Sequence, residues 1–157
     1  MRCYFWGTNN LSVRDKRGRG VASFTIPDWG VQFRTAHEGT ASECEYAALL
    51  ALLRFVENNP RVFEGKKLEV FSDAVALVQK VNRRVPPEPA EAKSLALVRV
   101  FRNRIPFELA WVPPEQNCAI RGVLDLAPLN TKTPIQYTTI DRGKTVDKPT
   151  SGDLPTG

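Results

Sequence analysis

The side chains that most often carry nucleophilic or zinc chemistry are few and scattered in this 157-residue sequence. It contains one histidine, His37, and three cysteines, Cys3, Cys44 and Cys118. Three widely spaced cysteines exclude a disulfide framework and a cysteine-rich zinc site. A single histidine disfavours a Ser–His or Cys–His hydrolase. We expect the cysteines to be small core side chains and His37 to lie at a strand end, without a catalytic role.

Basic side chains are a more prominent feature. One group precedes Gly20 and consists of Arg14, Lys16, Arg17 and Arg19; a second follows Asp73 and consists of Lys80, Arg83 and Arg84. The net charge of +5 is compatible with a polyanionic partner but does not demand one. Arginine suits bidentate phosphate contacts, whereas the alternatives are a solvated loop for the first group and a complement to a helix dipole for the second.

Two carboxylates stand where helices are expected to begin. Glu45 falls in the first turn of an apolar helix that Thr40 or Ser42 can cap, and Asp73 ends a strand just before another helix. A structural interpretation is that Glu45 complements the helix dipole and that Asp73 caps the following helix. The alternative is that the two carboxylates meet in space and form a site.

The elements that must position these residues alternate between strand and helix patterns. Period-two alternation around Pro27 and Asp28 predicts two antiparallel strands, and a further strand opens the chain. We expect strands over 2–8, 21–26, 29–38, 67–73 and 106–114, and helices over 45–59, 74–84, 94–103 and 115–127. The order β-β-β-α-β-α-α-β-α implies a mixed sheet covered by helices.

The apolar spacing within these elements predicts which side chains face the core. The expected inward residues of the later helices are Val75, Val78, Val81, Leu95, Leu97, Val98, Phe101, Ile120, Val123 and Leu124. Trp29 and Trp111 are expected to pack in the hairpin and in the core. Trp6 is ambiguous between core packing and a role in stacking on bases.

The C-terminal part has a different composition. We interpret residues 1–127 as the globular domain and residues 128–157, rich in proline and threonine, as a tail that is flexible or docks on a partner. Ile135, Tyr137 and Ile140 alternate weakly, a pattern compatible with one edge strand. No apolar run approaches the length of a membrane helix and the first residues do not resemble a signal peptide, so we expect a cytoplasmic protein.

Three junctions, taken in order, resemble motifs of the ribonuclease H family in its compact type. EYAALLALL resembles a motif in which a Glu opens a buried Ala/Leu helix, and EVFSDAVALVQKVN resembles a strand-end Asp followed by a helix. AWVPPEQN followed by LDLA resembles the family's terminal motif, and the resemblance covers about residues 1–127. It implies an α/β fold with a mixed five-stranded sheet, three antiparallel strands followed by alternating helices and strands, and helices on both faces.

The resemblance also implies metal-dependent cleavage of the RNA strand of an RNA–DNA hybrid, by four carboxylates around two Mg²⁺ ions. Glu45 and Asp73 match two of these positions. Trp6 stands at the position of the first-strand Asp, and Arg121 stands four residues after Asn117, where the last carboxylate is expected. Two carboxylates support one weakly held, hydrated Mg²⁺ or Mn²⁺ but not the two-metal clamp.

We therefore predict a catalytically degenerate ribonuclease H-like domain that binds nucleic acid, either RNA–DNA hybrid or structured RNA or DNA, without efficient cleavage and without a cofactor. The family's groove runs beside both basic groups. The residues predicted to contact nucleic acid are Arg14, Lys16, Arg17, Arg19, Lys80, Arg83, Arg84 and Arg121.

Two alternatives stay open at this point. One is an active, divergent ribonuclease H that uses Mg²⁺ or Mn²⁺, with Asp125, Asp15 or Asp28 supplying a missing carboxylate. The other is a non-enzymatic subunit that uses the fold as a scaffold and docks on another protein through its basic surface and residues 128–157.

Overall fold

Three antiparallel strands form one half of the sheet in the computed structural model, which describes residues 1–11, 16–120 and 136–139. These are β1 (Arg2–Asn9), β2 (Gly18–Ile26) and β3 (Val31–Gly39), and the short 3-10 turn η1 (Pro27–Trp29) joins the last two. Side chains alternate between the two faces of β1, so that Cys3 and Phe5 are buried. Phe24 and Phe33 stack on the same side at a ring-centroid distance of 4.8 Å.

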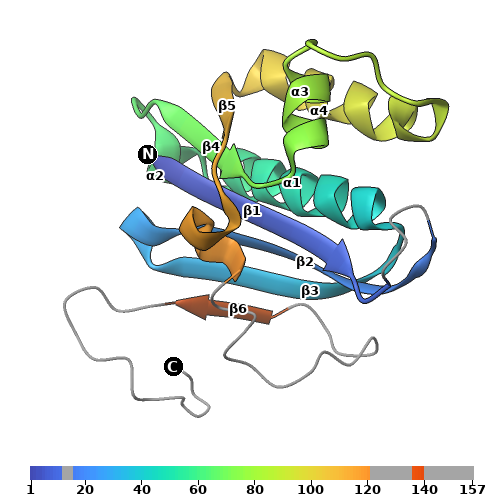
Figure 1. Cartoon of the computed structure of the whole chain (residues 1–157). Coiled ribbons are helices and arrows are strands. Elements are labelled where there is room, and N and C mark those ends of the chain that lie inside the picture. The colour runs from blue at the N-terminus through green and yellow to red at the C-terminus, as the bar shows by residue number, and fades with distance from the viewer. Residues whose placement is uncertain (12–15, 121–135, 140–157) are drawn as a thin grey trace.

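Helix α1 (Ala41–Asn58) lies along one face of this sheet (Figure 1). The Thr40 hydroxyl accepts a hydrogen bond from the Glu43 backbone amide, and the Glu43 carboxylate accepts one from the Thr40 amide, a complete capping box. This confirms Thr40 as the N-cap. Only Glu43 is acidic in the first turn, so the predicted first-turn position of Glu45 is wrong, and Glu45 instead lies one turn further along, buried.

The other half of the sheet consists of parallel strands and the helices that connect them. The elements are α2 (Pro60–Phe63), β4 (Leu68–Ser72), α3 (Val75–Val81), η2 (Pro89–Glu91), α4 (Ala92–Arg104), β5 (Phe107–Trp111) and η3 (Pro114–Gln116). Strand β4 runs parallel to both β1 and β5. Leu95, Val98 and Phe101 of α4 are buried as predicted, while Leu97 is exposed because it lies off this face.

Helix α3 is shorter than predicted and presents a different face to the core. It ends at Val81 because the amide of Arg84 bonds the carbonyl of Gln79 at 2.8 Å, and Arg83 adopts the left-handed φ of 62° that such a helix end requires. Val75 begins the helix and is exposed, not buried as predicted. Leu77 takes its place beside Val78 and Val81 in the core.

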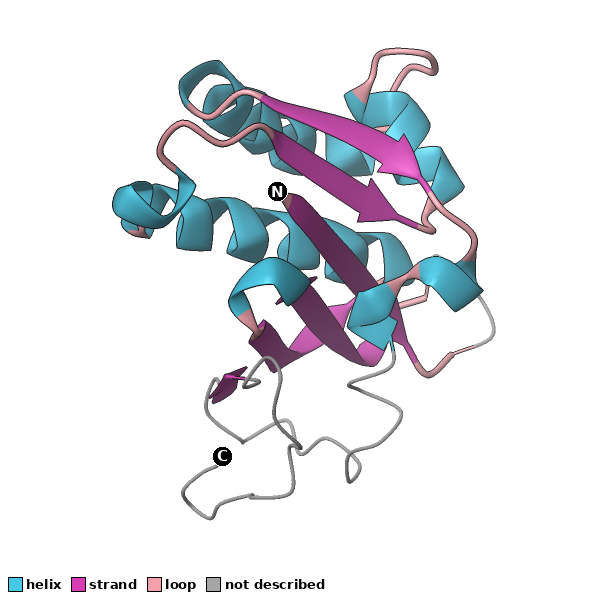
Figure 2. Cartoon of the chain, turned by 90° about the vertical axis from the view of Figure 1, so that its left-hand side faces the viewer, coloured by secondary structure: helices cyan, strands magenta, loops and turns pink. Residues whose placement is uncertain are grey.

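The sheet order is β5-β4-β1-β2-β3-β6, where β6 (Gln136–Thr139) pairs antiparallel with residues 31–34 of β3. The first five strands confirm the predicted mixed sheet, and β6 adds an edge strand from the predicted tail. The turns of residues 114–120 lie in front of the sheet in Figure 1, opposite α1, and Figure 2 shows these layers from the side. The Ser23 hydroxyl bonds the Ala119 carbonyl there at 3.1 Å.

The predicted boundary between residues 127 and 128 lies outside the described residues, as do Val123 and Leu124. Within the described part of the chain, every helix is too short or too polar to cross a membrane.

Candidate functional site

A cleft of about 350 Å³ opens where β1 and the end of β4 meet the N-terminal parts of α1 and α3. It is lined by Trp6, Gly7, Thr8, Glu45, Ser72, Asp73, Ala74, Val75 and Ala76. In open α/β sheets, ligands bind in the crevice outside the carboxyl ends of the strands. The structure therefore brings together the two carboxylates that the sequence singled out, at an edge suited to a ligand.

Gly7 allows α1 to approach β1 closely enough to bring Glu45 into the cleft. A Cβ atom at Gly7 would lie 2.2 Å from the carbonyl oxygen of Cys44 and 2.6 Å from the backbone nitrogen of Glu45. Both are backbone atoms, which have no flexible side chain to turn aside. Sequence reasoning missed that this glycine sets the distance between strand and helix.

Asp73 is oriented by Asn117, which is almost fully buried. The Asn117 amide nitrogen donates to Asp73 Oδ1 at 2.7 Å and to the carbonyl of Phe5 at 2.9 Å, so it links the residue after β4 to the middle of β1. Its amide oxygen accepts from the backbone nitrogen of Ala119 at 3.1 Å. The sequence contained Asn117 as part of a motif, but its two donors and one acceptor became visible only in the fold.

The predicted capping role of Asp73 is wrong. The N-cap of α3 is Ala74, which makes no side-chain capping bond, and the Ser72 hydroxyl accepts from the Ala74 amide at 3.1 Å. The Trp111 indole nitrogen donates to the backbone oxygen of Asp73 at 3.3 Å. The Asp73 carboxylate is thereby left to Asn117 and to the cleft.

Trp6 is partly exposed and lines the cleft, at the place where the resemblance implies a carboxylate. The other two tryptophans are less buried than predicted. Trp111 is 48% exposed at the end of β5, and Trp29 is 44% exposed in η1, at the far end of the β2–β3 hairpin. Core packing therefore does not account for Trp29 or Trp111.

The described residues do not fit the four-carboxylate, two-metal centre that the resemblance implies. Among residues 1–11, 16–120 and 136–139, no three His, Cys, Asp or Glu side chains gather where they could hold a metal ion. Glu45 and Asp73 supply oxygen ligands, but Trp6 supplies none. Asp28 lies in η1, far along the hairpin from the cleft, and Arg121, Asp15 and Asp125 lie outside the described residues.

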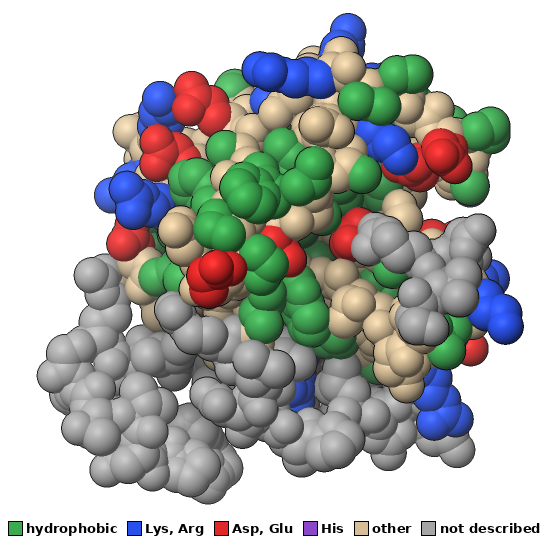
Figure 3. Space-filling model, viewed as in Figure 1, with side chains coloured by type: hydrophobic (Ala, Val, Ile, Leu, Met, Phe, Trp, Pro, Cys, Tyr) green, Lys and Arg blue, Asp and Glu red, His purple; other side chains and the backbone are tan. Residues whose placement is uncertain are grey.

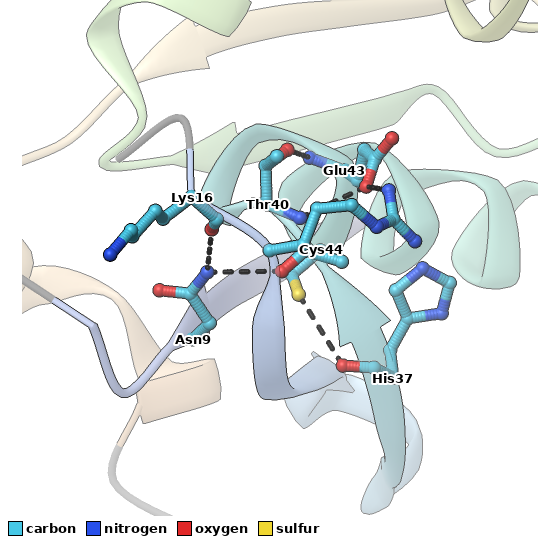
Figure 4. Close-up of polar contacts among 8 residues, drawn as sticks. Asn9, Lys16, His37, Thr40, Glu43 and Cys44 are labelled. Carbon is cyan, nitrogen blue, oxygen red and sulfur yellow. Dashed lines mark hydrogen bonds and ion pairs between the residues drawn. The ribbon is translucent and has the colours of Figure 1, made fainter. Parts of the chain in front are cut away.

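Of the first basic group, Lys16 and Arg17 lie in the connection between β1 and β2, and Arg19 lies near the start of β2. Asn9, buried at the end of β1, holds this connection by donating to the carbonyl oxygens of Lys16 at 2.9 Å and Gly39 at 3.0 Å (Figure 4). The Arg17 guanidinium pairs with the Glu43 carboxylate of the capping box. Lys16 and Arg19 are exposed, and Arg14 lies outside the described residues.

The second basic group divides into one paired and two exposed side chains. Lys80 Nζ lies 2.5 Å from Glu91 Oε2, and both side chains are nearly buried. The Tyr46 hydroxyl donates to the other Glu91 oxygen at 3.0 Å. Lys80 is thus occupied by a structural ion pair, whereas Arg83 and Arg84 are exposed just beyond α3. Figure 3 shows basic side chains at the top of the molecule, above α3 and α4.

The thiols and the imidazole have the properties of structural groups. Burial raises the pKa of Cys44 to about 11 and that of Cys3 to about 12, which keeps both thiols protonated and unreactive at neutral pH. The Cys44 thiol contacts the His37 carbonyl oxygen at 3.6 Å. Burial is also the main reason that the pKa of His37 is lowered, and His37 lies on β3, away from the cleft.

No family profile and no curated protein sequence matches the chain. Several solved structures are similar to it. LC11-RNase H1, isolated from compost by a metagenomic approach, is 18% identical with a TM-score of 0.62, over 78% of this chain and 96% of that one. Its complex with an RNA/DNA hybrid gives 17% identity and a TM-score of 0.61, over 78% of this chain and 98% of that one.

RNase H1 from the halophilic archaeon Halobacterium salinarum is 15% identical with a TM-score of 0.60, over 80% of this chain and 98% of that one. At such low identity these similarities concern the backbone arrangement. They agree with the strand order, the parallel β1–β4–β5 half and the position of α1. The chain therefore has a ribonuclease H-like fold.

Proposed function

We propose that this domain binds nucleic acid, as RNA–DNA hybrid or as structured RNA or DNA, without cleaving it efficiently. The observation that carries the proposal is the cleft itself, which combines Glu45 and Asp73 with Trp6 instead of a further carboxylate. The ribonuclease H-like fold suits a nucleic-acid-binding groove at this edge of the sheet. The side chains in the cleft favour binding of the nucleic acid over its hydrolysis.

Efficient cleavage is disfavoured because the cleft stabilises the transition state of hydrolysis too little. Two-metal hydrolysis depends on carboxylates that hold both ions against the attacking and leaving oxygens. Trp6 has no oxygen and fills part of the space beside Asp73. Each loss of about 1.4 kcal/mol of transition-state stabilisation lowers the rate tenfold, so the loss of one ion lowers it by orders of magnitude.

The shape of the fold and the charge of its surface support binding to nucleic acid. LC11-RNase H1, which shares the fold, was crystallised with an RNA/DNA hybrid. In this chain, Lys16 is exposed between β1 and β2, Arg19 is exposed in β2, and Arg83 and Arg84 are exposed one short helix away from the cleft. A seven-residue helix such as α3 spans ~10 Å, so Arg83 and Arg84 lie close enough to the cleft to contact the backbone of a nucleic acid bound there.

The test combines binding and cleavage in one set of samples. The full chain is incubated with labelled hybrid at ~150 mM salt, first with Mg²⁺ and then with Mn²⁺, and is analysed by gel shift and on a denaturing gel. We expect a shifted, uncut hybrid whose affinity does not depend on either ion. Lys16→Ala and Arg19→Ala should each reduce the slope of log affinity against log salt by about 0.9 if each contacts one phosphate.

Cleavage by the wild-type chain that is abolished by Asp73→Asn, but not by the control Asp28→Asn, would overturn the proposal and show an active ribonuclease. If the hybrid is neither cleaved nor shifted on the gel, the proposal is also overturned. That result would favour a protein partner that binds the basic surface and residues 128–157.

A further inference from the structure

The cleft differs from a phosphate site in the sign of its charge. Its described lining contains two carboxylates, Glu45 and Asp73, and no cation. Carboxylate oxygens accept hydrogen bonds from N–H groups, whereas phosphate oxygens have no N–H group to donate. The exposed cations that suit phosphates, Lys16, Arg19, Arg83 and Arg84, lie outside it. The cleft thus accepts a different part of a nucleic acid from the part that its surroundings accept.

The apolar side chains of the cleft form surfaces for a flat ring. Trp6 comes from β1, while Ala74, Val75 and Ala76 come from the first turn of α3. Val75 is 47% exposed, so its side chain is accessible to a ligand in the cleft. Proteins that take a base out of a helix hold it between aromatic and apolar side chains and bond its polar edge.

The polar side of the cleft can bond the edge of such a ring. Asn117 engages one oxygen of Asp73 at 2.7 Å and thereby fixes the orientation of the carboxylate. A carboxylate offers about four acceptor sites, so Asp73 retains acceptor capacity after this bond. Exocyclic amino groups of adenine, cytosine and guanine are donors of the required kind. The cleft volume of about 350 Å³ lies in the range of small-molecule pockets.

We propose that the cleft takes one unpaired nucleobase of the bound nucleic acid, stacked on Trp6, with an amino group donated to Asp73. This inference rests on the proposed function, and it adds a preference for bulges, loops or extruded bases over fully paired duplex. The flanking cations hold the backbone on either side. A bulged base is the favoured substrate because the cost of unstacking has already been met.

The test measures a ratio of affinities. The full chain is titrated by fluorescence anisotropy, without divalent ions, against three hybrids: one fully paired, one with a single bulged adenine, and one with an abasic residue at the bulge. We expect the adenine bulge to bind about 5- to 150-fold more tightly than the paired hybrid, the range that stacking on one aromatic side chain gives. The abasic bulge should bind like the paired hybrid.

Trp6→Ala should abolish the preference for the adenine bulge and leave paired-hybrid affinity within about twofold, so that paired binding reports on folding. Trp6→Phe should keep most of the preference. The control Trp29→Ala removes a more exposed indole at the far end of the hairpin and should change nothing.

The inference is overturned if the wild-type chain binds paired and bulged hybrids equally, or if Trp6→Ala keeps the preference; the proposed function survives both results. Failure of the wild-type chain to bind any of the three hybrids overturns the proposed function and the inference together.

Discussion

Glu91 and Asp73 both precede a helix, and neither side chain caps it. Their surroundings differ in a way that separates structure from function. Glu91 is matched on both oxygens, by Lys80 and by the Tyr46 hydroxyl, and is nearly buried between α1, α3 and α4. Asp73 is held by one amide and otherwise lines an open cleft. A carboxylate that is fully paired stabilises the fold, whereas one that is oriented but not enclosed is available to a ligand.

The strongest test of this comparison is to remove the cation beside Glu91 from one site and the negative charge of Asp73 from the other. Lys80→Met leaves Glu91 buried without its cation and should lower the free energy of unfolding by about 3–5 kcal/mol, whereas Asp73→Asn should lower it by about 1 kcal/mol or less. Urea denaturation of both variants provides the measurement. The double variant Lys80→Met with Glu91→Leu should recover much of the loss, and equal costs for the two single variants would contradict the distinction.

Close contact between the backbones of β1 and α1, rather than charge, stabilises the cleft region. Gly7→Ala should destabilise the protein by about 3 kcal/mol, because the new methyl group meets backbone atoms of Cys44 and Glu45. Gly18→Ala is the matched control on the neighbouring strand, since its methyl group meets only the flexible side chain of Leu11. Thermal unfolding followed by circular dichroism compares the two, and a similar loss in both would show that the approach of α1 to β1 is not the cause.

Arg83 offers a smaller test, in which stability and binding should change in opposite directions. Its left-handed backbone suits glycine, so Arg83→Gly should raise the free energy of unfolding by about 0.5–1 kcal/mol. Loss of the exposed guanidinium should at the same time weaken hybrid binding in a salt-dependent manner. Arg84→Gly removes a guanidinium without relieving the left-handed backbone and should weaken binding with no gain in stability.

The smallest expected effect concerns pH. The pKa of His37 is lowered in the folded protein, chiefly by burial, so the unfolded chain binds more protons as the pH falls below about 6.5. The stability contributed by neutral His37 is present above that pH and is lost as the pH falls towards its folded pKa. His37→Gln should therefore show a smaller decrease in Tm between pH 7 and pH 5 than wild type, and an unchanged decrease would show that other groups control it.

The sequence predicted the sheet because strand and helix periods are local properties. The alternation around Pro27 and Asp28 and the apolar run after Thr40 each specify an element without reference to the rest of the chain. The burial of individual side chains was harder to predict, because it depends on how a helix rotates on the core. Val75 and Leu97 have the right spacing to face inward, yet both are exposed, and α3 turns Leu77 inward instead of Val75.

The carboxylates of the site could be predicted from the sequence, but the side chains that pair with them could not. Glu45 and Asp73 could be found because each stands at a junction of two elements. The pairing of Lys80 with Glu91 joins residues 11 positions apart across a proline-rich connection whose path the sequence does not specify. The bond from Asn117 to the carbonyl of Phe5 requires the whole sheet to be in place.

The hydrogen bond from Asn117 to Phe5 has a consequence for the stage of synthesis at which the protein can first bind a ligand. Asn117 is 112 residues from Phe5 in the chain, and Ser23 is 96 residues from its partner Ala119. Contacts of such separation form late, because the entropy of the intervening chain must be lost first. A nascent chain that has completed only β1 to β4 does not yet contain the Asn117 amide that orients Asp73. The cleft is therefore finished only after nearly all of the domain has been synthesised, and a partly made chain does not yet hold a ligand there.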